Sequence, residues 1–134
     1  MFVLSLPISG GSFPFQLSVI RDLASISWKP DITMATSGGN VAAYTAAAGD
    51  WTTSGINESV KKLSSEVFTK SWSPSIPPYI IGIFRGCIYN SASKEAILFF
   101  RKNFDEKSIS KYEIWSVTTH IYERTAQMIC NRDK

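Results

Sequence analysis

Hydrophobic positions in the N-terminal half of the chain form two blocks, each a strand pattern followed by a helix pattern. Residues 2–6 are a short apolar run that ends at a proline, which is typical of a buried strand. Residues 15–24 carry apolar side chains at roughly helical spacing. Residues 31–36 predict a second strand, and residues 38–48 predict a second helix that ends at Gly49 as its C-cap. This alternation predicts an α/β domain with a mainly parallel sheet.

The C-terminal half has weaker periodicity. Residues 58–70 have one apolar face and predict an amphipathic helix. Prolines and glycines break up residues 71–90, which predict a loop, and a further helix is expected over residues 92–104. Residues 112–117 and 121–130 predict two strands, with His120 between or within them.

Composition narrows the class of protein. The 134 residues are 44% hydrophobic and 19% charged, which fits a single domain with a packed core. The net charge of +3 comes from scattered basic residues, so we expect no nucleic-acid partner. The apolar N-terminus is too short for a signal peptide or a membrane span. We therefore expect an intracellular protein, cytoplasmic or peripheral at a membrane surface, and the sequence leaves its oligomeric state open.

The two cysteines do not indicate a metal or redox site. Cys87 and Cys130 could form one disulfide, but their spacing matches no metal-binding or redox motif. Buried thiols in a reducing compartment are the preferred interpretation. No cluster of metal-ligating residues is seen, so no metal or cofactor is expected.

A single serine surrounded by small residues lies between the second predicted strand and helix. The stretch consists of Ala35, Thr36, Ser37, Gly38 and Gly39. It nearly matches the nucleophile elbow G-x-S-x-G, a sharp strand-to-helix turn that exposes the serine hydroxyl above the sheet. The first amides of the following helix could stabilise an oxyanion. The alternative is that Ser37 only caps the alanine-rich helix.

A second glycine turn follows the first predicted strand. Residues 9–12 read Ser-Gly-Gly-Ser and would lie at the same edge of a parallel sheet as Ser37. Backbone amides of Gly10 and Gly11 could supply the second half of an oxyanion hole. An ordinary strand-to-helix turn is the alternative, and a phosphate-binding loop is disfavoured because its lysine is missing.

Residues 2–49 resemble the N-terminal part of the patatin-like phospholipases. "VLSLPISGGS" and "SVIRDL" correspond to that family's glycine-rich oxyanion motif and the end of the helix after it. "PDITMATSGGNVAAYTAAAG" follows the family's nucleophile elbow and small-residue helix. The resemblance implies a three-layer α/β/α fold and a serine lipid acyl hydrolase without a cofactor. It implies Ser37 as nucleophile, oxyanion amides at Gly10, Gly11 and Gly38, a lipid or acyl ester substrate, and peripheral membrane contact.

The chain departs from the family pattern in two ways. The family's three oxyanion glycines appear as two, and its catalytic aspartate precedes a glycine, whereas no aspartate here does so. We therefore expect residues 1–134 to be an incomplete patatin-like domain that lacks the part carrying the base. The alternative is a catalytically dead or truncated fragment that acts as a lipid-binding or interaction module. A triad with His120 as base is a third reading.

Overall fold

The computed structural model of the chain describes residues 1–9, 12–65, 102, 106–120 and 122–132. The glycines at positions 10 and 11, the predicted loop over residues 71–90, and all but one residue of the predicted helix over 92–104 lie outside this part. Residues 1–59 and 106–134 form one compact unit, and residues 60–105 form a second. The sheet and three of the helices belong entirely to the first unit, which carries the candidate site.

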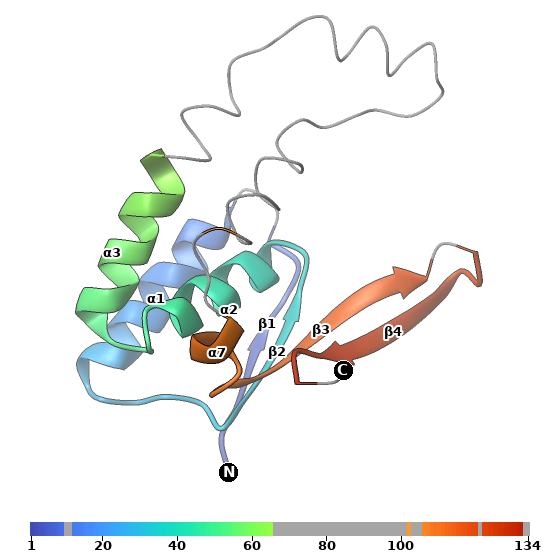
Figure 1. Ribbon diagram of the computed structural model, residues 1–134, viewed down its shortest axis with the longest axis horizontal. Coiled ribbons are helices and arrows are strands. Elements are labelled where there is room, and N and C mark those ends of the chain that lie inside the picture. Colours follow the sequence, from blue (N-terminus) through green and yellow to red (C-terminus); the bar gives the residue numbers. More distant parts are fainter. Residues whose placement is uncertain (10–11, 66–101, 103–105, 121, 133–134) are drawn as a thin grey trace, which may run out of the picture. The chain divides into compact units, whose positions relative to one another are not determined.

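Four strands form one sheet in the order β1-β2-β3-β4 (Figure 1). Their bounds are β1 Val3–Leu6, β2 Ile32–Thr36, β3 Glu113–His120 and β4 Thr125–Cys130. The first three strands are mutually parallel, and β4 returns antiparallel to β3. The predicted α/β fold with a mainly parallel sheet is therefore confirmed.

The described helices are α1, α2, α3 and α7, as labelled in Figure 1. Their bounds are Phe13–Ser25, Gly38–Ala48, Thr53–Leu63 and Glu106–Ile109. The predicted bounds of α2 are correct to the residue. The predicted start of α3 is wrong: the helix begins before residue 58, because the Thr52 hydroxyl accepts a hydrogen bond from the Gly55 amide at 3.1 Å and caps it. The short helix α7 was not predicted.

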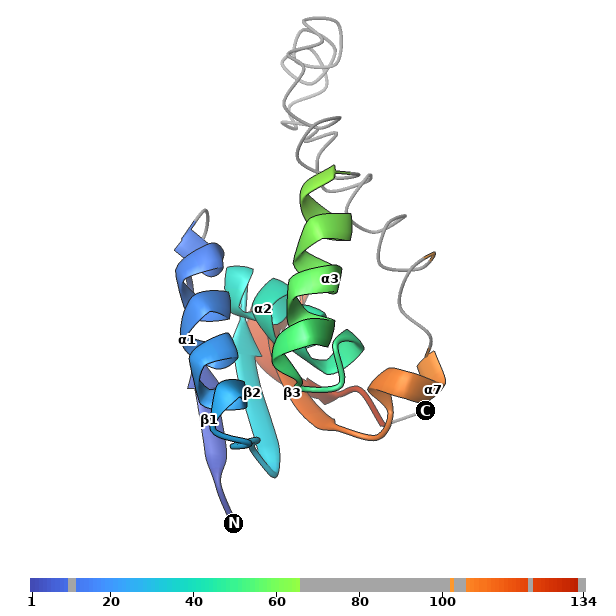
Figure 2. The same cartoon turned by 90° about the vertical axis from the view of Figure 1, so that its left-hand side faces the viewer.

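Helix α2 packs against the three parallel strands and against α1, which explains its small side chains. Figure 2 shows α1 and α2 on the same side of the strands. Four of its alanines and one threonine have at most 1% of their surface exposed: Ala42, Ala43, Thr45, Ala46 and Ala47. Gly49 ends the helix as predicted, with an ordinary φ of −83°. A Cβ there would overlap the Ile56 backbone, so close approach of α3 requires this glycine.

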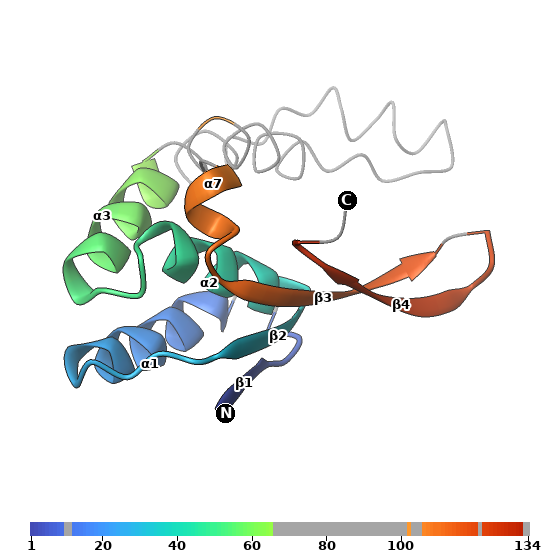
Figure 3. The ribbon, with the colours of Figure 1, turned by 60° about the horizontal axis from the view of Figure 1, so that its bottom comes forward.

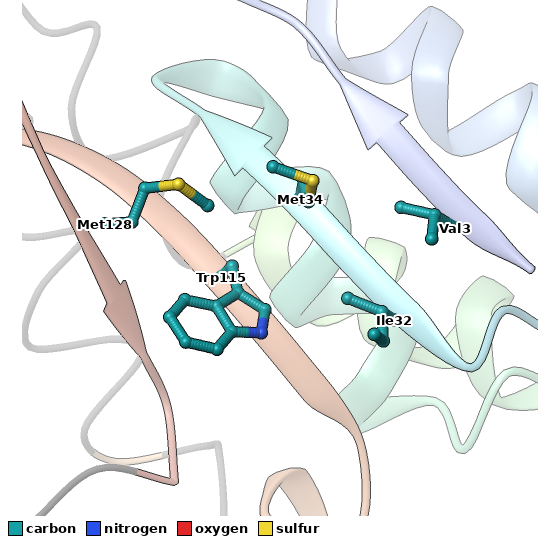
Figure 4. A pocket seen from close by; sticks show the side chains of 5 residues that line it. All are labelled: Val3, Ile32, Met34, Trp115 and Met128. Atoms are coloured by element: carbon teal, nitrogen blue, oxygen red, sulfur yellow. The ribbon is translucent and has the colours of Figure 1, made fainter.

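The two faces of the sheet differ. Leu6, Thr33, Ala35 and Ile114 alternate with their neighbours along the strands and are buried toward the helices. The intervening side chains form the opposite face, which no helix of the described residues covers (Figure 4). The described unit thus has a sheet and one helical layer, and the second helical layer of the patatin-like arrangement remains a prediction.

The hairpin β3–β4 extends past the other strands, as Figure 3 shows. Only residues 113–117 of β3 pair with β2, whereas residues 115–120 pair with β4. Asn131 ties the base of this hairpin to the end of α7. Its side chain accepts a hydrogen bond from the Ile114 amide at 2.9 Å and donates to the Tyr112 carbonyl at 3.0 Å.

Tyr112 joins the start of β3 to the end of α2. Its hydroxyl donates a 2.6 Å hydrogen bond to the Asp50 carboxylate, and its ring lies 6.3 Å from that of Trp51. Burial, followed by the hydrogen bond and the charge of Asp50, raises the pKa of Tyr112 from 10.0 to about 12. The neutral phenol is therefore the form that the fold stabilises.

We expect the free energy of unfolding to fall as the pH rises from 10.0 toward about 12. In this window the unfolded chain has lost the phenol proton while the folded chain retains it. Urea denaturation of the parent and of Tyr112→Phe at pH 8 and across this window measures the effect. The difference in free energy of unfolding between the parent and Tyr112→Phe should shrink as the pH rises. A difference that stays constant would contradict the raised pKa of Tyr112.

Candidate active site

Ser37 is the one residue between the end of β2 and the start of α2. β2 ends at Thr36, α2 begins at Gly38, and Ser37 is exposed. Its backbone has φ of 53° and ψ of −123°. The serine therefore lies at the tip of a strand-to-helix turn, at the carboxyl edge of the parallel strands, where α/β proteins place their functional groups.

The backbone of Ser37 is strained. A positive φ in a residue with a side chain costs about 1–3 kcal/mol and is typical of functional turns. Four other described residues share a positive φ: Ser27, Asp50, Trp51 and Arg124. They follow the ends of helices or lie in the β3–β4 turn. Only Ser37, within the described residues, combines this conformation with the strand-to-helix position of a nucleophile elbow.

The hydroxyl of Ser37 does not cap α2. Its side chain makes no capping hydrogen bond, and the Asn40 amide donates instead to the Ser37 backbone carbonyl at 3.0 Å. The capping alternative is therefore wrong, because a capping serine would use its own hydroxyl. The exposed hydroxyl remains available to a ligand.

The small residues of the elbow permit close packing of α2 on the sheet. Ala35 is 1% exposed, and Gly38 and Gly39 are buried. A Cβ at Gly39 would overlap the backbone oxygen of Leu6 and come within 3.0 Å of the Leu6 Cβ. The start of α2 thus rests on the end of β1, and this contact holds Ser37 above the junction of the two strands.

The amides at the start of α2 point toward the elbow. Gly38 is the first residue of the helix, where backbone N–H groups lack intrahelical partners. The first turn of α2 contains no acidic residue that would compete for them. The partial positive charge of a helix N-terminus favours an anion here, so the arrangement can accept an oxyanion.

The strand next to the elbow ends at the same edge. Leu6 pairs in parallel with Ala35, so the chain leaves β1 beside Ser37. Gly10 and Gly11 lie outside the described residues, and their predicted position near Ser37 stays a prediction. The preceding residues are anchored: the Ser9 hydroxyl donates to the Gln16 side chain at 3.1 Å, which donates to the Pro7 carbonyl at 3.0 Å.

The described aspartates lie away from Ser37. Asp31 precedes β2 at the opposite end of the strand, where its carboxylate accepts from the Phe2 amide. Asp50 follows the far end of α2, about 16 Å along the helix from the elbow. Asp22 is exposed on α1 beside Arg21. Asp105 and Asp133 are outside the described residues.

His120 lies within β3 as its last residue. Thr36 pairs with Val117 in the parallel register, so the backbone of His120 is three residues farther along, about 10 Å beyond the edge. It pairs with Thr125 on the antiparallel side. The histidine therefore belongs to the projecting part of the hairpin.

Asn40 is a polar residue that the sequence did not single out. It lies in the first turn of α2, and its side-chain oxygen is buried without a hydrogen-bond partner in the described part of the chain. The only available signal is an amide at the start of an alanine-rich run. That signal is too general to assign a role.

Comparison with known proteins finds no matching family model, no similar curated protein and no similar solved structure. Among the residues that the structure describes, no group of three or more histidine, cysteine, aspartate or glutamate side chains could hold a metal ion. Over the same residues, no helix has the length and apolar character needed to cross a membrane. The resemblance to patatin-like phospholipases therefore rests on the sequence alone.

Replacing Ser37 with glycine should stabilise the protein. Glycine adopts positive φ without steric cost, so Ser37→Gly should raise the free energy of unfolding by about 1 kcal/mol. Urea denaturation followed by circular dichroism measures the change. A clear loss of stability would show that the serine side chain makes a stabilising contact instead of bearing strain.

Replacing Gly39 with alanine should have the opposite effect. The new methyl would overlap the Leu6 carbonyl and push α2 off β1, at a cost of about 2 kcal/mol. The same denaturation experiment measures it. Ser54→Ala, at an exposed position of α3, is the control and should change stability by less than about 0.5 kcal/mol. Equal effects at both positions would contradict the close contact.

Proposed function

We propose that the chain carries the nucleophile of a patatin-like serine acyl hydrolase that acts on lipid or other acyl esters. The observation that supports this most strongly is the conformation of Ser37. Its exposed hydroxyl caps nothing, and its strained backbone lies between a parallel strand and a helix N-terminus. Strain at a surface serine has no structural benefit, so its presence favours a functional role.

In the proposed reaction, the Ser37 oxygen attacks the ester carbonyl carbon. The resulting oxyanion accepts a hydrogen bond from the Gly38 amide and, by resemblance, from the amides of Gly10 and Gly11. A base takes the serine proton and delivers it to the departing alcohol, which leaves an acyl-serine. Water then attacks the acyl-serine while the base takes a proton from it, and the base passes this proton to the Ser37 oxygen as the carboxylic acid departs.

The base is the missing part of this proposal. The resemblance implies an aspartate followed by glycine, which the 134 residues lack. Asp31 and Asp50 lie at the far ends of β2 and α2 from the elbow. This placement favours the alternative for the chain by itself, a lipid-binding or interaction module that retains the elbow without full turnover.

Hydrolysis of p-nitrophenyl butyrate tests the role of Ser37. An oxyanion hole and a nucleophile without a base leave a rate roughly 10³–10⁴ times that in water, and we expect the chain to lie near this level. In a longer chain that supplies the aspartate, the activity should be far higher and Ser37→Ala should abolish it, whereas in the 134 residues alone the same change should leave most of the residual rate, which comes from the oxyanion hole. Ser54→Ala, an exposed serine on α3, is the matched control and should retain the activity of the longer chain.

The same assay tests whether His120 is the base. His120→Ala should stay within a few-fold of the parent, and a loss equal to that of Ser37→Ala would favour the triad. Rapid turnover that survives Ser37→Ala would refute the proposed nucleophile. A chain that binds phosphatidylcholine vesicles while its hydrolysis is indistinguishable from the uncatalysed rate would favour the binding module.

A further inference from the structure

The outer edge of β4 carries unpaired backbone groups at Ala126 and Met128 in the described part of the chain. β4 is the last strand of the sheet. The Asn131 amide donates inward to the Ile114 carbonyl at 2.9 Å, and alternate residues of an antiparallel strand point their backbone groups the same way. The N–H and C=O groups of Ala126 and Met128 therefore point outward, away from β3.

This edge lacks the features that normally protect an edge strand. Residues 125–130 contain no charged residue and no proline. The side chains of Met128 and Ile129 are 48% and 50% exposed. The other edge, β1, is shorter and is followed by Pro7, and the carboxylate of Asp31 binds the amide that precedes it. A strand from another chain is therefore expected to pair with β4 and not with β1.

The sheet face beside β4 is also apolar. A shallow cavity of about 240 Å³ is lined by Val3, Ile32, Met34, Trp115 and Met128 (Figure 4). Met128 belongs both to this face and to the open edge. A strand added to β4 would therefore cover the outer flank of Met128 and extend the apolar face in one continuous sheet.

We infer that β4 pairs antiparallel with β4 of a second copy of this chain, about a two-fold axis that passes beside Gln127. Side chains that lie directly opposite each other in a sheet are on the same face. The two-fold axis must therefore pass where a residue faces its own copy, and not midway between two neighbouring residues. The Gln127 register places Met128 opposite Ala126 of the partner subunit and joins the two sheets into one. This inference is independent of the proposed chemistry at Ser37.

Charge disfavours the register centred on Met128 and permits self-pairing of the uncharged strand. Centring the axis on Met128 would place Arg124 opposite Arg132 of the partner subunit, which opposes like charges. The Gln127 register avoids this and places Thr125 opposite Ile129 of the partner subunit. Because the paired residues carry no charge and each strand supplies both donors and acceptors, β4 complements its own copy.

Sedimentation velocity of the full chain, from about 1 to about 500 µM, tests the inference. We expect a concentration-dependent dimer. Gln127→Lys and Gln127→Glu each place like charges in direct opposition at the axis, so each variant alone should dimerise about threefold to fivefold more weakly. An equimolar mixture should recover the dimer, because lysine then opposes glutamate.

Thr118→Lys is the matched control. Thr118 is exposed and pairs with Gln127 on the β3 side. A lysine there adds the same charge to the same face of the sheet, one strand away from the edge. This variant should dimerise like the parent. Circular dichroism spectra must be the same for all variants.

A disulfide gives a second, independent readout. The Gln127 pair would be of the close, non-hydrogen-bonded type, whose Cα separation of about 4.5 Å suits a disulfide. Gln127→Cys should therefore form a dimer linked through position 127, identified by mass spectrometry after mild oxidation. A monomer at every concentration, or a dimer that neither charged variant weakens and that lacks the 127–127 link, would overturn the inference.

Discussion

The contact of Gly39 with the end of β1 determines how the rest of the described unit is arranged. Because this position has no Cβ, the start of α2 rests directly on the Leu6 carbonyl. A helix held that close to a sheet can carry only small side chains on its buried surface, which accounts for the alanines of α2. The same constraint forces the chain to reverse within one residue after β2. The strained backbone of Ser37 is the result.

Chemical competence and stability oppose each other at this turn. A serine lies where glycine would fit without strain, and the packing of α2 holds its backbone in this conformation. The helix N-terminus beside it supplies positive potential, while Asp31 and Asp50 lie at the opposite ends of β2 and α2. Under the proposed function, the described unit supplies the nucleophile and the amides for the oxyanion, and no described aspartate lies beside them to accept the proton.

The sequence was most informative where local pattern and tertiary constraint coincide. The strands around the elbow and the bounds of α2 could be read directly, because apolar runs, glycines and alanines change abruptly there. The start of α3 could not, because Thr52 caps a turn whose first residues lack an apolar face. The need for Gly49 lies in the approach of Ile56, a contact that no local pattern reveals. The positive φ of Ser37 likewise became visible only with the backbone.

The pairing of β2 with β3 has a consequence for the order in which the chain folds. Glu113 pairs with Ile32 across roughly 80 residues of intervening chain, so this closure costs about 1 kcal/mol more loop entropy than the pairing of β1 with β2, and such non-local contacts form slowly. During synthesis, β1 and β2 leave the ribosome well before β3. Until β3 arrives, the uncharged strand β2, which ends as an interior strand of the sheet, presents an open edge to its surroundings. The nascent chain is therefore most exposed to misassociation beside the serine on which its proposed function depends.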